Sequence, residues 1–413
     1  MLKRINFISL ISIALVFNAC GGGGTTNNIT DNDTLLEQNN SREEISQSEI
    51  NETVSVENKK LAYIASSDED YLKLNLKKNK VEPWEDAMRT NGESGSYEWW
   101  YSDFIFSDGT TVAVAFYSKF LFDTYGSSLP LVTINIVYPD GREVSEQDFS
   151  EYGKKIDAST SIAEVHVKSS YLTYEEGNYH LYYSKDNITF DAIMVSELPM
   201  WRPETGHIYF GDEGNYFAWL PAQASSTVTA TLEENGIKKE LTGTGYHDHN
   251  WGNSPIHENI NNWYWGRAKA GEYTLIFSDI IAEGKYDYER VPIMMVAKGD
   301  KILKLNGSIE VERSSLLTDK TTEKSYANRL RFTQKDENGR TYTIESSRKK
   351  DITFVDMNSL PIETGNRPTY LRSLSDISLI ITEINGSKEE YKGLGIIEQM
   401  SFNDSVVNSP KNK

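Results

Sequence analysis

Short runs rich in apolar and aromatic residues, separated by polar turn-forming residues, fill the chain from Ser96 onward. Residues 97–106 are followed by Ser107-Asp-Gly, and residues 131–138 by Pro139-Asp-Gly, both of which are typical hairpin turns. Similar runs occupy residues 111–122, 163–169, 179–183, 188–195, 207–211 and 226–232. Short strands at this spacing, without helical segments between them, predict an all-β sandwich or up-and-down barrel and disfavour a parallel α/β fold.

The first 80 residues follow a different pattern. Residues 21–60 are rich in glycine, asparagine, threonine, serine and glutamate, so they cannot bury enough apolar surface to offset the entropy lost on ordering. We therefore expect a flexible tether and leader over residues 21–80. The alternation in Tyr71-Leu-Lys-Leu-Asn-Leu predicts a first strand or an ordered leader, and residues 83–88 are expected to form a short helical turn.

The N-terminus has the features of a secretion signal. Lys3 and Arg4 precede an apolar run over residues 5–17, and Ala19 precedes Cys20, the single cysteine of the chain. This arrangement resembles a bacterial lipoprotein signal over residues 1–20, in which Cys20 carries the lipids; an ordinary signal peptide with an incidental cysteine is the alternative. The signal predicts a lipid-anchored protein of the bacterial cell envelope, at the outer membrane. A single cysteine excludes disulfides within the monomer and a cysteine metal site.

Two internal echoes divide the rest of the chain. Lys392-Gly-Leu-Gly-Ile-Ile-Glu398 repeats the layout of Thr242-Gly-Thr-Gly-Tyr-His-Asp248, and Glu98-Trp-Trp-Tyr-Ser-Asp103 has a counterpart in Trp263-Tyr-Trp-Gly-Arg267. Two units that open and close alike predict a duplicated barrel. The predicted division is an N-terminal domain at residues 81–255, a C-terminal domain at residues 256–403 and a disordered tail at residues 404–413.

Composition narrows the classes of function. The aromatic share of 11%, with 24 tyrosines and 8 tryptophans, suits sheet surfaces better than helical bundles. The formal net charge of -19 opposes nucleic-acid binding, which needs lysine and arginine to neutralise phosphates. The chain also lacks a Gly-x-Ser-x-Gly elbow, a phosphate-binding Gly-x-x-x-x-Gly-Lys loop, a dinucleotide fingerprint and a His-Glu-x-x-His motif. Serine-hydrolase and nucleotide-dependent classes are therefore unsupported.

The densest cluster of reactive side chains is Gly-Thr-Gly-Tyr-His-Asp-His-Asn-Trp-Gly at residues 243–252. In an extended strand alternate side chains share a face. One face then carries His247, His249 and Trp251, and the other carries Tyr246, Asp248 and Asn250. The two histidines admit three interpretations: a proton relay facing a ligand, a metal site shared with His207 or His257, or ordinary hydrogen-bonded interior residues. Because the spacing fixes no three-histidine set, we expect no metal.

Asp279 is a second candidate for chemistry. It lies in the apolar run Leu275-Ile-Phe-Ser-Asp-Ile-Ile281, where partial desolvation would raise its pKa and let it hold a proton near neutral pH. Such a group can protonate a carbon–carbon double bond, and electron-rich rings would stabilise the resulting cation. The rings nearest in sequence belong to Trp251, Trp263, Trp265 and Tyr273. The alternative is that Asp279 forms an ion pair with Arg267 in a barrel wall.

Aromatic residues supply the candidate ligand contacts. Trp99 and Tyr101 follow the start of the first barrel and are placed to line an apolar cavity, whereas Trp100 is expected to pack in the core. Residues 199–203, Pro-Met-Trp-Arg-Pro, are expected to cross a barrel mouth, where Trp201 would contact a ligand. The predicted ligand-binding residues are Trp99, Tyr101, His247, Trp263, Trp265 and Phe277.

Four of these segments, in this order, resemble the carotenoid 1,2-hydratase (hydroxyneurosporene synthase)-like family. They are Tyr97-Glu-Trp-Trp-Tyr101, Phe217-Ala-Trp-Leu-Pro221, residues 243–252 and Trp263-Tyr-Trp-Gly-Arg267. The resemblance runs from about Glu93 to Met400, and the His-Asp-His-Asn-Trp-Gly block is its most specific part. It implies two consecutive lipocalin-like (calycin) antiparallel β-barrels packed on each other. The wider group includes decalin-forming cyclases and many uncharacterised secreted proteins.

The resemblance also implies a reaction. The hydratases add water to a terminal isoprenoid double bond without a cofactor, through acid-catalysed protonation and capture of a carbocation. His249 and Trp251 match the family's functional histidine and tryptophan, and Asp279 matches its proton-donating aspartate. Phe277 stands where the hydratases carry tyrosine, and Ser102 replaces an aromatic residue.

Two classes of function follow. One is a hydratase-like carbon–oxygen lyase or isomerase acting on an isoprenoid or other apolar substrate; the other is non-catalytic binding or transfer of a hydrophobic ligand in the envelope. Asp279→Asn separates them, because an enzyme would keep its ligand affinity and lose turnover. We expect a hydrophobic small molecule and, through the lipid anchor, the membrane as partners, and no cofactor or nucleic acid.

Overall fold

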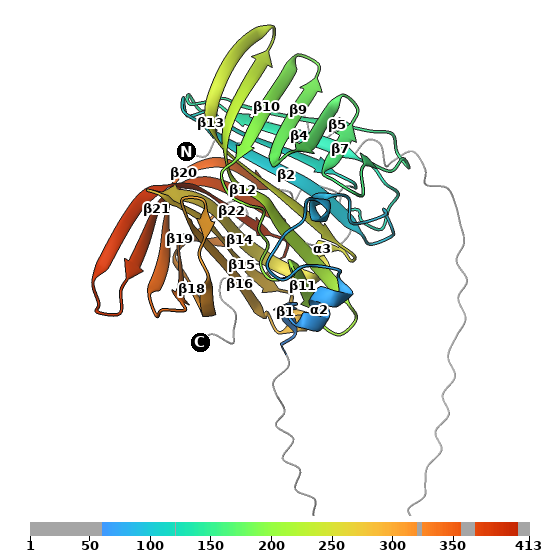
Figure 1. Ribbon diagram of the computed structural model, residues 1–413. Coiled ribbons are helices and arrows are strands. Elements are labelled where there is room, and N and C mark those ends of the chain that lie inside the picture. The colour runs from blue at the N-terminus through green and yellow to red at the C-terminus, as the bar shows by residue number, and fades with distance from the viewer. Residues whose placement is uncertain (1–59, 120, 320–323, 357–367, 404–413) are drawn as a thin grey trace, which may run out of the picture. The chain divides into compact units, whose positions relative to one another are not determined.

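The computed structural model describes residues 60–119, 121–319, 324–356 and 368–403 (Figure 1). The expected signal peptide with Cys20, the tether up to residue 59 and the tail over residues 404–413 lie outside the described residues. The described part contains two curled antiparallel sheets of 13 and nine strands and a few short helices. The all-β fold class predicted from the sequence is confirmed.

The strands of the first sheet lie between Ala62 and Gly252 along the chain. Its strand order is β5 (Glu143–Phe149), β4 (Leu131–Val137), β3 (Thr111–Tyr117), β2 (Tyr97–Phe106), β13 (Ile237–Gly252), β12 (Asn215–Glu234), β10 (Ile188–Ser196), β9 (Asn178–Lys185), β8 (Ser170–Glu175), β7 (Glu164–Val167) and β6 (Asp157–Ala158). At the side, β1 (Ala62–Ile64) pairs with β11 (His207–Phe210), which pairs with β12.

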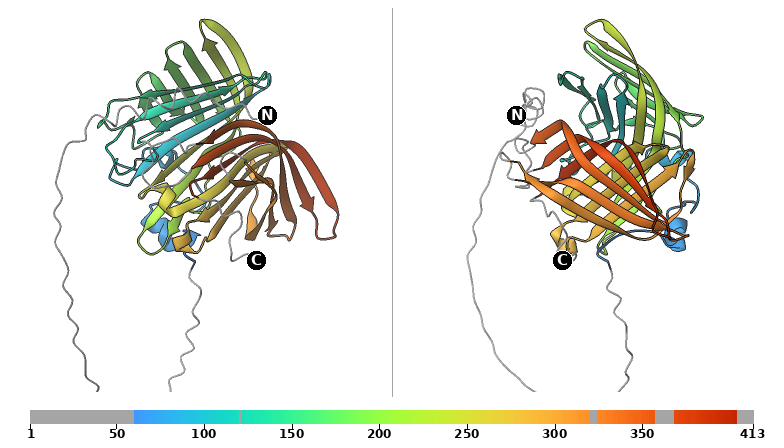
Figure 2. Two further views of the ribbon diagram at one scale, coloured as in Figure 1. Left: turned by 180° about the vertical axis from the view of Figure 1, so that it is seen from behind. Right: turned by 90° about the vertical axis from the view of Figure 1, so that its left-hand side faces the viewer.

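The second sheet is curled like the first (Figure 2), and it repeats the closing arrangement of the first. Its order is β17 (Lys301–Ile302), β16 (Arg290–Lys298), β15 (Tyr273–Ala282), β14 (Ile260–Ala270), β22 (Lys388–Ser401), β21 (Thr369–Thr382), β20 (Thr341–Asp356), β19 (Ser325–Asp336) and β18 (Leu305–Thr318). In each sheet the last strand returns to pair with an early one, β13 with β2 and β22 with β14. The two sequence echoes therefore mark equivalent strands. The described residues from Leu61 onward form one compact unit, so the division at residue 255 stays a prediction.

The leader corrects one prediction. The segment expected to form a first strand or an ordered leader is ordered, but its residues 68–73 form the helix α2 (Asp68–Lys73), so the strand alternative is wrong there. Ser67 caps this helix, because its hydroxyl accepts from the Asp70 backbone N–H at 3.1 Å while the Asp70 carboxylate accepts from the Ser67 N–H at 3.0 Å. This reciprocal cap outweighs a short alternation of apolar residues.

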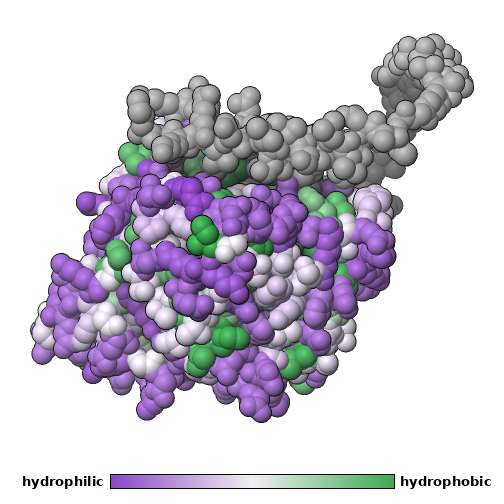
Figure 3. All heavy atoms as spheres, turned by 90° about the horizontal axis from the view of Figure 1, so that it is seen from above, coloured by the Kyte–Doolittle hydropathy of each residue, from purple (hydrophilic) through white to green (hydrophobic). Residues whose placement is uncertain are grey.

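The other helices are short: η2 (Pro83–Asp86), which confirms the expected turn, α3 (Ile256–Asn259) and η3 (Gly284–Tyr286). None of the helices in the described part has the length and apolar character of a membrane span. The face of the molecule drawn in Figure 3 is mainly hydrophilic, with small separate apolar patches.

Alternation along the strands divides the apolar side chains among three cores. One lies on the inner face of the first sheet and contains Trp100 and Trp251; one lies on the inner face of the second sheet and contains Tyr264 and Phe277. The third contains side chains of both sheets, such as Tyr246 and Trp265. We call this third region the inter-sheet region. The alternation predicted for residues 243–252 is confirmed, since Trp251 and Tyr246 belong to different cores.

Candidate active site

A row of polar and aromatic side chains lies in the inter-sheet region. On the first sheet, Asp248 of β13 pairs in register with Tyr101 of β2. On the second sheet, Trp265, Glu398 and Arg372 are in register across β14, β22 and β21. The Tyr101 hydroxyl donates to Glu398 Oε1 at 2.6 Å, and this hydrogen bond links the first sheet to the second. Because in-register residues point to the same side of a sheet, the echo residues Asp248 and Glu398 both face this region.

Asp248 is buried and accepts three hydrogen bonds. Its Oδ2 accepts from Trp219 Nε1 at 2.8 Å and from the Tyr246 hydroxyl at 2.9 Å, and its Oδ1 accepts from Asn250 Nδ2 at 2.7 Å. Burial raises the pKa of Asp248 to about 7, although these donors oppose the shift. Near neutral pH the carboxyl group therefore exists in both its protonated and ionised forms.

Glu398 is the second buried carboxyl group of the row. Burial raises its pKa, and the nearby Arg372 opposes the shift. The two side chains approach to 3.5 Å between Arg372 Nε and Glu398 Oε1. Arg372 is only 1% exposed, yet Nε, Nη1 and Nη2 have no hydrogen-bond partner among the described residues. The Trp265 indole N–H is likewise unpartnered within the described part of the chain. Buried donors normally have partners, so the N–H groups of Arg372 and Trp265 are available to bind oxygen atoms of a ligand.

An ion pair next to this row replaces one expected earlier. Arg267 Nε donates to Asp103 Oδ1 at 2.5 Å, and both side chains are buried. The pairing of Arg267 with Asp279 considered from the sequence is therefore wrong. The reason is strand geometry: Arg267 and Asp279 point to opposite faces of the second sheet, because Tyr264, not Arg267, is in register with Asp279.

Aromatic rings line the same region. Trp99 stacks on Phe217 with 6.0 Å between ring centroids, Phe217 stacks on Trp263 at 6.4 Å, and Trp263 meets Phe402 edge-on at 5.1 Å. Trp265 packs against Tyr246 at 4.9 Å. Such rings offer an apolar ligand flat contact surfaces and can stabilise positive charge.

A second polar cluster occupies the inner face of the first sheet. His249 Nε2 lies 2.8 Å from Glu98 Oε1, and His247 Nε2 lies 3.2 Å from Asp86 Oδ2. The Tyr179 hydroxyl donates to the same Asp86 oxygen at 2.5 Å. Asp86 raises the pKa of His247 enough to outweigh burial, which acts in the opposite direction and is the largest single effect.

Around this cluster, Trp100 stacks on His249 with 4.5 Å between ring centroids, and Trp251 lies at 4.7 Å. His207 contacts Trp251, and burial lowers the pKa of His207 to about 4. Among the described residues no group of histidine, cysteine, aspartate or glutamate has the arrangement of a metal site.

The acidic partners in this cluster were not predicted from the sequence. Glu98 belongs to the quoted Tyr97-Glu-Trp-Trp-Tyr101 motif, and Asp86 lies within the expected helical turn, as the last residue of η2. A charged residue inside a run of aromatic residues on a predicted strand is a signal that could have identified Glu98, because a buried carboxylate needs partners. Nothing in the spacing points to Asp86.

Asp279 lies on the inner face of the second sheet. Arg313 Nε donates to its Oδ2 at 2.6 Å, and Arg290 Nε lies 2.9 Å from its Oδ1. Arg313 also lies over the ring of Tyr264, 4.5 Å from its centroid. Asp279 thus forms ion pairs with two guanidinium groups. Its surroundings are therefore more polar than the apolar residues beside it in the sequence suggest.

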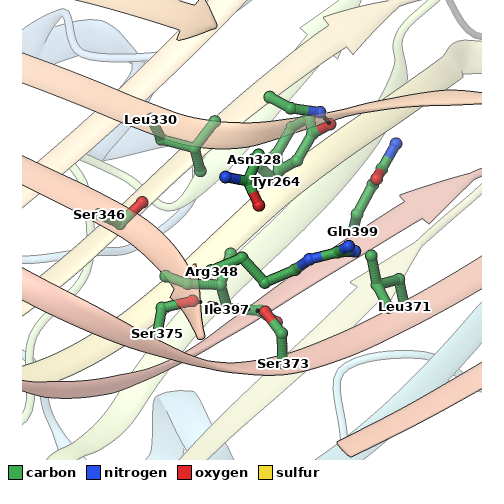
Figure 4. Close-up of a pocket in the computed structure, with 11 residues that line it drawn as sticks. Tyr264, Asn328, Leu330, Ser346, Arg348, Leu371, Ser373, Ser375, Ile397 and Gln399 are labelled. Atoms are coloured by element: carbon green, nitrogen blue, oxygen red, sulfur yellow. Dashed lines mark hydrogen bonds between the residues drawn. The ribbon is translucent and has the colours of Figure 1, made fainter. Parts of the chain in front are cut away.

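The inner face of the second sheet leaves little free space near Tyr264. Side chains such as Arg348, Ser373 and Gln399 surround a cavity of about 10 Å³ (Figure 4). A cavity of this size holds about one water molecule.

The structure therefore distributes the predicted site residues over three places. Trp99, Tyr101, Trp263 and Trp265 come together in the inter-sheet region; His247, His249 and Trp251 lie on the inner face of the first sheet; and Asp279 and Phe277 lie on the inner face of the second. Each of these nine residues is buried or half-buried, whereas Cys20, the predicted lipidation site, lies outside the described residues.

Residues 204–342 match the family model of the carotenoid hydratase CrtC. A quinolone epoxide rearrangement protein of Emericella nidulans is 32% identical over 73 residues, which is 18% of this chain and 20% of that protein. A hydroxyneurosporene dehydrogenase of Chlorobaculum tepidum is 25% identical over 170 residues, 40% of this chain and 38% of that protein. The matched segments thus span well under half of these relatives.

Solved structures share the fold over nearly their whole length. The structure of CghA with Sch210972 has a TM-score of 0.56 at 14% identity and covers 80% of this chain and 98% of that one. Kievitone hydratase from Nectria haematococca has a TM-score of 0.52 at 15% identity, covering 80% of this chain and 95% of the other. The lipocalin-like architecture expected from the motifs is confirmed.

Proposed function

We propose that this chain, a member of the carotenoid hydratase-like family, catalyses cofactor-free hydration or isomerisation of an apolar, isoprenoid-like substrate in the cell envelope. The single observation that supports the proposal best is the pair of buried carboxyl groups, Asp248 and Glu398, in a region walled by aromatic rings. The envelope location rests on the signal predicted around Cys20.

In the proposed reaction Asp248 is the acid. Its protonated form transfers the proton to one carbon of a double bond, and the other carbon becomes a carbocation. Trp265 and Tyr101, which face the same region, stabilise that charge through their ring faces. Exclusion of bulk water from this buried region limits unproductive quenching of the cation.

Glu398 then acts as the base. In hydration it accepts a proton from the water molecule that attacks the cation; in isomerisation it removes a proton from a neighbouring carbon, so that the double bond forms at a new position. The Tyr101 hydroxyl, bound to Glu398, orients the carboxylate. Its raised pKa, caused by burial, suits a group that must gain a proton.

The family motifs support a competing assignment, with Asp279 as proton donor and His249 and Trp251 as its helpers. Against it, the carboxyl group of Asp279 is already engaged in two ion pairs within the second sheet, with Arg290 at Oδ1 and with Arg313 at Oδ2. In our proposal the Glu98–His249 pair supports the first sheet from within.

The test uses an acyclic isoprenoid polyene in deuterated water and in water labelled with heavy oxygen, with mass spectrometry of the recovered polyene. We expect solvent deuterium in the product of the wild-type protein and none with Asp248→Asn, while polyene binding persists. Label uptake by Asp248→Asn but not by Asp279→Asn would transfer the donor role to Asp279. Polyene bound and recovered unlabelled from the wild-type protein would instead support binding or transfer. Thermal unfolding of each variant verifies that it is folded.

A further inference from the structure

The second sheet does not close on itself through backbone hydrogen bonds. Its edge strands are β17 and β18, and no ladder joins β16 to β18 in the described chain, although the two strands lie beside each other. At one end of this seam, side chains bridge the gap: Arg290 Nη1 donates to the Val311 carbonyl at 3.2 Å, and Arg313 binds Asp279.

Further along the seam the bridging groups are apolar and leave a groove, which we call the seam groove. It has a volume of about 1200 Å³. Apolar side chains of two segments line it: Met294 of β16 with Leu305 and Ile309 of β18, and Met200 and Trp201 from the loop between β10 and β11. We call these five side chains the apolar floor of the groove, and the volume of the groove suits a chain-like ligand.

The rim of the seam groove has the opposite charge to the rest of the protein. Five basic residues and three acidic residues line it, in a chain whose net charge is -19. Lys78 and Lys80 are paired with Asp68 and Glu82. Lys301 and Lys304 form no ion pair with any other described residue.

One buried polar atom in the groove is also unused. Gln334, only 9% exposed, donates through Nε2 to the Gly307 carbonyl at 3.0 Å, but its Oε1 has no hydrogen-bond partner among the described residues. A buried acceptor of this kind normally binds an ordered water molecule.

We propose that the seam groove is a second ligand site and binds a long-chain carboxylate, a fatty-acid-like amphiphile. Its acyl chain lies along Met294, Leu305, Ile309 and Trp201, and its carboxylate reaches Lys301 and Lys304. The methionines suit this ligand because a flexible thioether chain adapts to an irregular apolar partner. This site is separate from the Asp248–Glu398 pair, so it does not depend on the function proposed above.

The experiment measures binding of oleate to the purified full chain by calorimetry, with oleyl alcohol as the head-group control. We expect Ile309→Glu to weaken oleate binding by about tenfold or more, because it places a charge on the apolar floor. The double change Lys301→Glu, Lys304→Glu should weaken oleate binding by about tenfold and leave oleyl alcohol binding unchanged. Ile237→Glu and Lys238→Glu, at the exposed β12–β13 hairpin, are the matched controls and should bind oleate as the wild type does.

Several results would overturn the proposal. Oleate affinity that is the same in all variants would mean that the groove is not the site. Equal weakening by the hairpin controls would show a nonspecific effect of charge. Binding to phosphatidylglycerol vesicles with no binding of monomeric oleate would assign the surface to a membrane instead. Thermal unfolding and the isoprenoid assay on each variant separate these outcomes from loss of the fold or of the inter-sheet chemistry.

Discussion

At the scale of single residues, Asp248 is the group whose titration should control the proposed reaction. A proton donor must carry its proton, and burial raises the pKa of Asp248 to about 7. We therefore expect the rate to be highest on the acidic side of this value and to fall as pH rises through it. The measurement is the initial rate of deuterium uptake between about pH 5 and pH 9. A rate that is flat across this range would exclude Asp248 as the donor.

Tyr101 provides a second residue-scale prediction. Its hydroxyl orients Glu398, so Tyr101→Phe should slow turnover by about tenfold to a hundredfold, with little change in polyene affinity. Tyr63, which stacks on Tyr209 away from this row, is the matched control for loss of one tyrosine hydroxyl. Comparison of kcat with KM for Tyr101→Phe and Tyr63→Phe tests the role. An equal effect of both changes, or an effect on KM alone, would argue against it.

At the scale of elements, the leader is held to the first sheet by buried charge pairs. Asp86 of η2 contacts His247, and the neighbouring Glu85 binds Arg202 at 2.7 Å between Oε2 and Nε. The folded-state pKa of His247 lies above its unfolded value, so protonated His247 stabilises the fold. This contribution is complete below the unfolded pKa, about 6.5, and is lost as pH rises through the folded pKa.

Hydrogen exchange of residues 62–88 tests this prediction. We expect greater protection at about pH 6 than at about pH 8.5 in the wild type, and no such difference in Asp86→Asn. Asp86→Asn should also cost about 3 kcal/mol of folding free energy, because it leaves a buried histidine without its charged partner. A pH difference that persists in the variant would show that another group is responsible.

At the scale of the whole molecule, the Asp103–Arg267 ion pair couples the two sheets. Asp103→Asn leaves Arg267 buried without a counter-charge, so we expect a loss of about 3–5 kcal/mol and a lower unfolding temperature. Calorimetry of the variant measures this loss. Glu345→Gln breaks the exposed pair with Arg331, 2.7 Å between Oε1 and Nη2, and should cost less than about 1 kcal/mol. Equal effects of the two variants would mean that the inter-sheet pair contributes no more than a surface contact.

Much of the fold was predictable because most strands have one buried face. Residues 188–195, for example, alternate between buried and more exposed positions and form most of β10. β12, by contrast, has 20 residues, of which only 226–232 were predicted as strand. Its residues 217–226 are buried on both faces and therefore show no alternation.

The site was only partly predictable, because its decisive contacts join distant segments. Alternation placed His247 and Asp248 on opposite faces correctly. Asp86, however, is 161 residues from His247, and Arg313 is 34 residues from Asp279. No spacing rule encodes such pairs, and the apolar neighbours of Asp279 in the sequence concealed the two arginines that bind it. Contacts with residues distant in the sequence determine whether a buried carboxyl group can donate a proton or is held in an ion pair.

The duplicated topology has a consequence for symmetry. In a dimer of identical half-chains, a two-fold axis would present the same residue from both sides. Here β13 and β22 occupy equivalent positions in one covalent chain, and they present an aspartate held by Trp219 and Tyr246 and a glutamate beside Arg372. Because the two halves belong to one chain, the equivalent positions can carry different residues. In the proposed reaction Asp248 gives a proton and Glu398 receives one.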